Sequence, residues 1–515
     1  MKGSWWDISW LHVLSPLLVV VAGVTLVLLL TLMDKRSSGR GTAFRWVGLS
    51  SLLFSLGLVL ARSGAPIESI LARSYRWDTP TMVFTAALLV IAIVSLLFSL
   101  HETLAWEGEW VATLLCAVVG GCLAIGATDF ISLFVSLELF GLSTYILVGL
   151  QKGNRFTMEA AWKYLITGGV ATAVFLYGVS FMVGPAGETG FSSFYTYILV
   201  MLQSGAKGSM AWILFSFFLI FIGLALKLAL VPFHLWAPDV YRGSGSPMLV
   251  WLLVGVKVTL LAVLFRLATL VYQPVLYLLS LLGYRMVPWL IFGLALLTIL
   301  VGNVASLFQK RVKGAFAFAS LAQGGYFLLP FSNNQPIFES VSPLVLPGGV
   351  SLLVYVVAYA LVVFGGLAII ETVTSESGSE DVGAFAGLIH RSPVIALSMT
   401  GLLLSAAGVP LLTAGFFAKF YLLLNVMEHD SYRAMLFLLV TLFSYLAYFR
   451  ILRQIFFRRC SVDFKRMNVP WNLSFVITVS VAGTLLLGFF PGGVSRFIDA
   501  ENWVRSGSLV SNESR

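Results

Sequence analysis

Four ionisable residues lie in the middle of long apolar runs. They are Glu138 in FVSLELFGLS, Lys227 in GLALKLALVP, Lys257 in LLVGVKVTLL and Lys419 in GFFAKFYLL. A charged side chain at the centre of a bilayer costs roughly 2.5–3.5 kcal/mol on insertion scales, so each position needs an explanation. Burial disfavours the cationic form of an amine, and a nearby carboxylate favours it. Acid–amine pairs of this kind can take up and release protons.

These residues favour a proton relay. Lysine suits a relay better than arginine, because arginine stays protonated in proteins. Glu138 with Lys227, then Lys257, then Lys419, would provide successive stations across the plane of a membrane. The alternative is a set of static ion pairs between helices, but one acid cannot neutralise three deep lysines.

Four other polar residues are secondary candidates. Lys163, in EAAWKYLITGG, lies about one turn into an apolar run, where it could join the relay or extend to the membrane surface. His234 could pass protons between stations or cap a broken helix. Gln323 does not titrate, but it could orient a chain of water molecules or bridge two helices. Asp129 begins an apolar run, where a carboxylate is expected as a helix cap.

The composition indicates the elements that hold these residues. Of 515 residues, 59% are hydrophobic and 11% are charged, and the mean hydropathy is +0.95. A soluble domain carries about 25% charged residues. The apolar runs are about 20 residues long, which is the length of a membrane-spanning helix. Because the alternating pattern of a β-barrel is missing, we expect an all-α, polytopic membrane protein.

The pattern predicts about fourteen transmembrane helices. They are expected near residues 11–33, 46–62, 81–100, 110–127, 129–150, 159–184, 210–234, 247–271, 286–307, 313–331, 343–370, 393–425, 433–456 and 471–490. Basic residues gather in alternate loops, for example around residues 35–45, 310–313 and 450–466. The basic loops are therefore expected in the cytoplasm, with both termini outside.

Two of the predicted spans are interrupted. The seventh contains Pro232 and is followed by Pro238, and the twelfth contains Gly408, Pro410 and Gly415. Proline removes a backbone donor and kinks a helix. In lipid such breaks survive only where protein or a water-filled cavity satisfies the freed groups. Paired broken helices indicate inverted repeats around a transport path, formed here by spans four to eight and nine to thirteen.

The sequence gives no sign of a cofactor, metal or nucleic-acid site. Cys116, Cys122 and Cys460 lack the spacing of zinc or iron–sulfur ligands. A glycine-rich dinucleotide turn after a strand is missing as well. The net charge of +9 comes from short basic loops rather than from a basic stripe that would bind nucleic acid.

Several stretches resemble a known family. ATDFISLFVSLELFGLSTYILVG resembles the fifth-helix region of the antiporter-like subunits of respiratory complex I. EAAWKYLITGGVATAVFLYG and LKLALVPFHLWAPDVYRGSGSPM are most similar to subunit N of bacterial NADH:quinone oxidoreductase. RVKGAFAFASLAQGGY and SAAGVPLLTAGFFAKFYLL continue the likeness, which runs from about residue 109 to residue 457.

The resemblance implies a fourteen-helix fold with two inverted five-helix repeats. Residues 1–109 would form N-terminal transmembrane helices, 110–271 the first antiporter-like repeat, 286–456 the second, and 457–515 a loop, the last helix and a tail. It also implies a bacterial cytoplasmic membrane protein that pumps protons. Quinone reduction would occur elsewhere in the complex, and quinone, flavin and iron–sulfur clusters would be held by partner subunits. Those partners would include neighbouring antiporter-like subunits.

The resemblance also implies roles for individual residues. Glu138 and Lys227 match the acid–lysine pair of a first half-channel. Lys257 matches the central lysine, Lys419 the lysine of the second half-channel, and Lys163 the lysine of the sixth helix. Gln323 departs from the pattern, because many relatives have histidine there, although plastid and cyanobacterial relatives also use glutamine.

Three alternative functions stay open. The chain could be a subunit of a multisubunit sodium/proton antiporter, a membrane subunit of an energy-converting hydrogenase, or a structural scaffold whose charges only pair helices. The stretches EAAWKY and PFHLWAPDVY favour subunit N over the first two.

Overall fold

A computed structural model describes most of the chain. It covers residues 9–33, 41–62, 68–70, 74–101, 106–150, 155–203, 207–272, 286–333, 345–458 and 467–493. The described residues fall into two compact units. Unit 1 runs up to Lys227 and includes residues 255–272, and unit 2 comprises Leu228–Val254 and the residues from Met286 onward.

The structure confirms an all-α, polytopic membrane protein. The described residues hold 11 helices that are long and apolar enough to cross a membrane, and every predicted span contains a helix or a broken pair of helices. Helices are expected here, because in lipid each backbone group must be hydrogen-bonded within its own segment. The inverted symmetry, the repeat boundaries and the orientation of the termini stay predictions.

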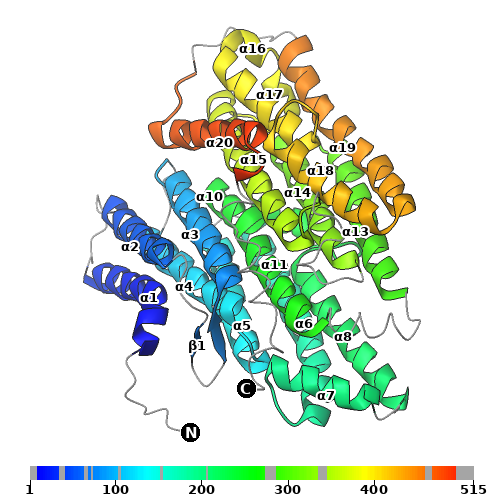
Figure 1. The fold of residues 1–515 in the computed structure, drawn as a ribbon. Helices are drawn as coiled ribbons and strands as arrows, with labels where there is room; N and C mark the ends of the chain where they lie inside the picture. Colours follow the sequence, from blue (N-terminus) through cyan, green and yellow to red (C-terminus); the bar gives the residue numbers. More distant parts are fainter. Residues whose placement is uncertain are drawn as a thin grey trace. The chain divides into compact units, whose positions relative to one another are not determined.

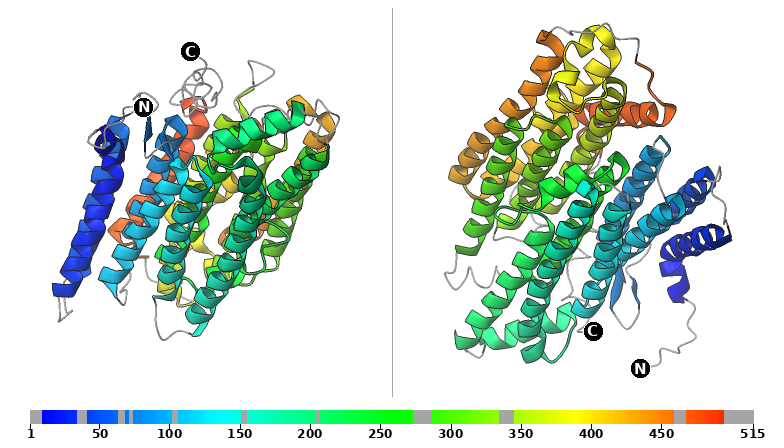
Figure 2. Two further views of the ribbon diagram at one scale, coloured as in Figure 1. Left: turned by 90° about the horizontal axis from the view of Figure 1, so that it is seen from below. Right: turned by 180° about the vertical axis from the view of Figure 1, so that it is seen from behind.

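Unit 1 is a helical bundle with one small hairpin. Its helices are α1 (Ser9–Met33), α2 (Gly41–Ala61), α3 (Thr79–Ser99), α4 (Glu107–Gly126), α5 (Phe130–Gly149), α6 (Arg155–Ala186), α7 (Phe191–Gln203), α8 (Lys207–Lys227), α11 (Val256–Leu267) and the π-helical η2 (Ala268–Tyr272). α1 and α2, drawn in blue, lie side by side (Figure 2), and α4 packs on α5 while α6 packs on α8. Asp129 caps α5, as predicted, by accepting a hydrogen bond from the backbone N–H of Ser132 at 2.8 Å.

Two elements of unit 1 were not predicted. β1 (Glu68–Ile70) and β2 (Tyr75–Trp77) form an antiparallel pair in the register Glu68 to Trp77. α7 lies between the sixth and seventh predicted spans, and it buries Phe191, Phe194 and Ile198 at helical spacing. Both elements are too short to cross a bilayer, so a search for long apolar runs does not find them.

Unit 2 is a second bundle (Figure 1). Its elements are α9 (Ala237–Gly243), α10 (Ser246–Val250), the π-helical η1 (Trp251–Gly255), α13 (Met286–Leu307), α14 (Val312–Leu328), η3 (Leu329–Ser332), α15 (Gly348–Ser377), η4 (Val382–Phe385), α16 (Leu388–Arg391), α17 (Pro393–Ala407), α18 (Ala414–His429), α19 (Ser431–Phe457) and α20 (Trp471–Phe489). α15 packs against α14, α17, α18 and α20, so it lies in the middle of this unit.

Both predicted helix breaks are confirmed. α8 ends at Lys227 and α9 begins only at Ala237, after a segment with a cis Val231–Pro232 bond. α17 ends at Ala407, and α18 begins at Ala414. Between α17 and α18, Gly408 adopts a left-handed conformation with φ +83°, which glycine reaches without steric cost.

Candidate functional site

The structure brings Glu138 and Lys227 together in unit 1. The Nζ atom of Lys227, the last residue of α8, lies 3.6 Å from Oε1 of Glu138 on α5. The hydroxyl of Thr172 on α6 donates a hydrogen bond of 2.6 Å to the same oxygen. The side chains of Lys227 and Glu138 are 10% and 28% exposed. The pair is therefore largely removed from the surface of the chain, with Glu138 the more accessible partner.

Lys257 lies deep inside unit 1. Its side chain is on α11, directly after the π-helical turn η1, and the residue is 2% exposed. α11 packs against α3, α4 and α8, which surround it with apolar helices. Single π-turns inside α-helices occur often at functional sites.

Lys163 is placed differently from the other lysines. Its Nζ atom forms an ion pair of 2.6 Å with Glu159, four residues earlier on α6, and both side chains are more than a third exposed. This contact is local to one helix face. The Lys163–Glu159 contact and the Glu138–Lys227 contact are two separate ion pairs, and the predicted role of Lys163 in a relay stays a prediction.

Lys419 occupies the second helix break. Its amine donates hydrogen bonds to the carbonyl oxygens of Ala406 and Ala407, at 2.9 and 2.8 Å, and to the hydroxyl of Ser444 at 3.3 Å. The two carbonyls belong to the last turn of α17, where the helix dipole places partial negative charge. Tyr445 donates a further hydrogen bond of 3.0 Å to the carbonyl of Gly408. Side chains of unit 2 thus satisfy the backbone groups that the break frees.

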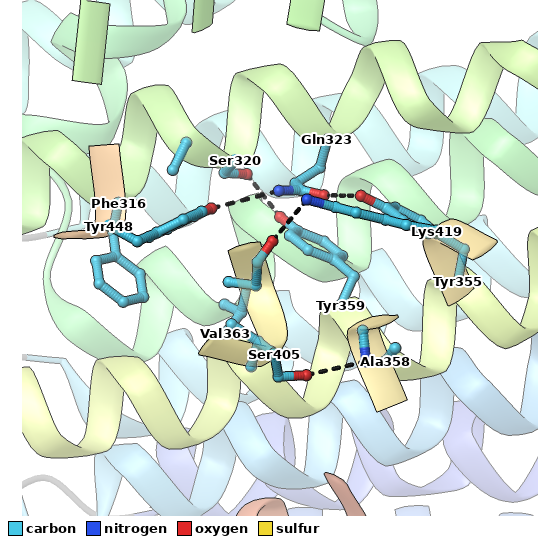
Figure 3. Close-up of a pocket in the computed structure, with 14 residues that line it drawn as sticks. Phe316, Ser320, Gln323, Tyr355, Ala358, Tyr359, Val363, Ser405, Lys419 and Tyr448 are labelled. Atoms are coloured by element: carbon cyan, nitrogen blue, oxygen red, sulfur yellow. Dashed lines mark hydrogen bonds between the residues drawn. The ribbon is translucent and has the colours of Figure 1, made fainter. Parts of the chain in front are cut away.

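A cavity of about 30 Å³ lies beside Lys419. Figure 3 shows the Lys419 amine reaching the same space as Gln323 and Tyr355. The cavity can hold about two water molecules, since one molecule needs about 10–15 Å³ of this kind of volume. Its polar lining is formed by Ser320, Gln323, Tyr355, Tyr359, Ser405, Lys419 and Tyr448.

Gln323 connects three helices at this cavity. Its side-chain oxygen accepts a hydrogen bond from the hydroxyl of Tyr355 on α15, and its side-chain nitrogen donates to the hydroxyl of Tyr448 on α19 at 3.5 Å. Ser320 and Tyr359 form another hydroxyl pair at 2.6 Å. Both interpretations of Gln323 made from the sequence therefore fit the geometry, because it bridges helices and also lines a space for water.

His234 lies in the first helix break. It is partly buried, and its carbonyl oxygen accepts a hydrogen bond from the backbone N–H of Ala237 at the start of α9. Cys116 and Cys122 are free thiols on α4, whereas Cys460 lies outside the described residues. Among the described residues, no group of three or more histidine, cysteine or acidic side chains is placed to hold a metal ion.

Sequence reasoning missed the neutral partners of the charged residues. Thr172 at the first site, and Tyr355, Tyr359 and Tyr448 at the second, were not singled out. Hydroxyl groups are common in transmembrane helices and cost much less to bury than a charge. The only available signal was their presence inside apolar runs, and that does not separate a site residue from one that hydrogen-bonds its own helix.

Comparison with known proteins places this architecture in a family. Residues 127–444, which contain the four deep ionisable residues and both breaks, match the family described as NADH:quinone oxidoreductase/Mrp antiporter, TM. The chain belongs to this family. The NADH-quinone oxidoreductase subunit N of Anoxybacillus flavithermus is a member that is 36% identical over 459 residues, which cover 87% of each protein. The predicted resemblance to subunit N is confirmed.

Solved structures show the same antiporter-like fold. A chain of respiratory complex I from Thermus thermophilus aligns with a TM-score of 0.72 and 24% identity, covering 93% of this chain and 98% of that one. A chain of the Mrp complex from Dietzia aligns with a TM-score of 0.76 and 16% identity, covering 96% and 99%. At these identities the likeness concerns the fold alone.

Proposed function

We propose that this chain is a proton-translocating membrane subunit of a bacterial NADH:quinone oxidoreductase in the cytoplasmic membrane. The observation that carries the proposal is the placement of Lys227 and Lys419, each at a helix break and each beside polar partners. Relatives with 36% and 34% identity are named as subunit N of this enzyme. Quinone, flavin and iron–sulfur chemistry would be supplied by other subunits, among them neighbouring antiporter-like chains.

The first proton site is the Glu138–Lys227 pair. At 3.6 Å the carboxylate stabilises the ammonium form of Lys227 without forming a close hydrogen bond. When Lys227 gives its proton to a neighbouring water molecule, the amine becomes neutral and the partly buried Glu138 carboxylate loses its counter-charge. That anion then attracts a replacement proton from water. Thr172 holds the carboxylate in position through its hydroxyl during this cycle.

The second proton site is Lys419. As a cation it is stabilised by the two carbonyls at the end of α17 and by Ser444. In the neutral amine the lone pair becomes an acceptor, so the amine can receive a proton from water in the adjacent cavity. Gln323 orients that water, and in the proposed order Lys257 acts after the Glu138–Lys227 pair and before Lys419. The order of these stations is part of the proposal.

A sodium/proton antiporter subunit is the second candidate. The description of the family includes Mrp antiporters, and the Dietzia chain has the same fold. A membrane subunit of an energy-converting hydrogenase is a third possibility with the same relay. The genes next to this one, and the ion that reconstituted vesicles accumulate, distinguish these candidates from one another.

Lys227→Ala in the assembled complex tests the proposal. The control is Lys310→Ala, because Lys310 is an exposed lysine in a loop. We expect Lys227→Ala to lose most proton accumulation in vesicles while subunit composition is unchanged, and Lys310→Ala to pump normally. A structural scaffold predicts normal pumping by both variants once assembly is intact, and that result would reject the proposed function.

A further inference from the structure

A row of polar contacts follows the seam between α14 and α15. These helices pack against each other in unit 2 (Figure 1). The side-chain contacts between them show that they run antiparallel. Lys313 meets Glu371 at one end, and Gln323 meets Tyr355 near the other. The Ser320–Tyr359 hydroxyl pair lies between them. Ser320, Tyr359, Gln323 and Tyr355 all line the cavity beside Lys419.

The end of this seam at Lys313 holds a cluster of charged side chains. The amine of Lys313 lies 3.2 Å from Glu371 and 3.5 Å from Glu380, so two carboxylates share one ammonium. Ser246, at the start of α10, donates a hydrogen bond to the same oxygen of Glu371 that faces Lys313. The side chains of Lys313 and Glu371 are 18% and 15% exposed. Glu371 is therefore partly buried but still reachable by water.

Phe316 lies along α14 between this cluster and the other residues of the cavity lining. On α14 it lies one turn after Lys313 and one turn before Ser320, and it is buried and lines the cavity. Its ring rests on Gly366 of α15, where an added Cβ would lie 2.5 Å from the Cε1 atom of the ring. Glycine at this position lets the ring fill the seam. An aromatic ring at such a contact excludes water, and a rotation of its side chain would admit it.

We propose that Glu371 is a proton-loading carboxylate for Lys419 and that Phe316 is the gate between them. A proton from water at the end of α14 and α15 binds Glu371, which lowers the negative charge beside Lys313. When the ring moves, water connects Glu371 to the Ser320–Tyr359 pair. Glu371 then gives up its proton and returns to a carboxylate. Each hydroxyl or water molecule on the route gains one proton and passes one on. The last proton converts the neutral amine of Lys419 to the ammonium ion. This inference rests on the proposed function.

The shared charge is what suits Glu371 to this task. Glu371 does not hold the Lys313 amine alone, because a carboxylate oxygen of Glu380 lies 3.5 Å from the same nitrogen. Arg311, at 3.8 Å from Glu380, lies at an exposed position and is screened by water. The alternative is a static ion pair that only ties α14 to α15. That alternative predicts no link between this cluster and the cavity.

Thiol labelling in the assembled complex tests the gate. Ala319→Cys places a thiol in the cavity lining, in a chain whose three native cysteines are replaced by serine. A charged methanethiosulfonate reagent is added from the side of the Lys313 cluster. We expect Phe316→Ala to speed labelling by at least about tenfold, because removing a buried ring leaves a cavity. Phe292→Ala, which removes another buried ring outside this cavity, should leave labelling unchanged. Equal labelling with and without the Phe316 ring would overturn the gate.

Proton pumping by Glu371→Gln tests the loading role without removing packing volume. We expect pumping to fall about tenfold, since a positioned acid or base commonly contributes at least that much. The matched control is Glu376→Gln, because Glu376 is an exposed acid on the same helix whose contact is the backbone N–H of Asn468. Normal pumping by Glu371→Gln, together with failed pumping by Lys227→Ala, would overturn the loading role alone. Normal pumping by both variants would reject the proposed function itself.

Discussion

The amine of Lys419 donates a hydrogen bond of 2.8 Å to the carbonyl oxygen of Ala407. Ala407 is the last residue of α17, and Gly408 ends that helix in a left-handed conformation. The helix break and the buried amine therefore stabilise each other. The break leaves carbonyl oxygens without a partner in the helix, and the amine donates hydrogen bonds to them. Lipid tails could not supply these hydrogen bonds. A lysine at this position is both a structural and a titratable element.

Replacing Lys419 with methionine should destabilise unit 2. The carbonyls of Ala406 and Ala407 would lose a donor, at a cost of about 1–3 kcal/mol for each buried group left unsatisfied. The midpoint of thermal denaturation of the solubilised complex, followed through the release of this subunit, measures the loss. Lys419→Arg keeps donors near the same carbonyls and should lie closer to wild type. A methionine variant as stable as wild type would show that water donates hydrogen bonds to these two carbonyl oxygens.

Thr172→Val should slow proton translocation. The Thr172 hydroxyl donates to Glu138 at 2.6 Å, and valine has a similar shape without the donor. Hydrogen bonds to charged groups contribute about 1.5–3 kcal/mol, so the rate should fall roughly tenfold or more. Initial rates of dye quenching in vesicles provide the measurement, with Thr172→Ser as the variant that keeps the hydroxyl. If valine pumps as fast as serine, the position of Glu138 does not depend on this contact.

Asp78→Asn should destabilise unit 1. Arg266 binds both carboxylate oxygens of Asp78, at 2.5 and 2.9 Å, and both residues are buried. Asp78 also caps α3 by accepting the backbone N–H of Thr81 at 3.0 Å. Removing one member of a buried ion pair costs about 3–5 kcal/mol, since the other charge is left without compensation. Thermal denaturation at neutral pH should show a clear loss, and an unchanged midpoint would contradict this account of the ion pair.

The same ion pair predicts a dependence on pH. Burial alone would raise the pKa of Asp78, but the charge of Arg266 and its hydrogen bonds outweigh burial and hold that pKa below its ordinary value. A carboxylate whose pKa is depressed in the folded protein stabilises the fold fully at any pH above the pKa of aspartate in the unfolded chain, which is about 3.9. That contribution is lost as the pH falls through the folded pKa. The difference in midpoint between wild type and Asp78→Asn should be constant from about pH 5 to 8 and should narrow below about pH 4.

Gln323→Leu should reduce pumping, whereas Gln323→His should preserve much of it. Leucine would leave the hydroxyls of Tyr355 and Tyr448 without their shared partner and would make the cavity beside Lys419 less polar. Histidine can both donate and accept in the same space. Proton translocation normalised to the amount of assembled complex compares the two variants. Equal activity of the leucine and histidine variants would mean that Gln323 only fills space.

The charges and breaks could be predicted from the sequence, because each violates a rule of the membrane environment. Lys227, Lys257 and Lys419 interrupt apolar runs, and Pro232 and Gly408 interrupt helices. Such residues carry a large energetic cost in lipid, so their presence alone is informative. The helices that contain them were placed correctly for the same reason, since a span needs a minimum length of apolar residues.

The partners of these residues could not be predicted. Thr172 meets Glu138, and Lys313 meets Glu371, across helices that are distant in the sequence. The hydrophobic periodicity and the residue spacing of a sequence do not predict which faces of two helices will pack together. The ion pair between Lys163 and Glu159 was not predicted either, although the two residues lie four positions apart on one helix.

Proton translocation per electron pair by Lys419→Arg tests the central claim most directly. Arginine keeps a positive charge and hydrogen-bond donors at the end of α17, but it does not release its proton. We expect the complex to assemble and to lose the proton yield through this subunit. A Lys419→Arg complex that translocates protons with the wild-type yield would contradict the account, because a fixed cation would then be sufficient.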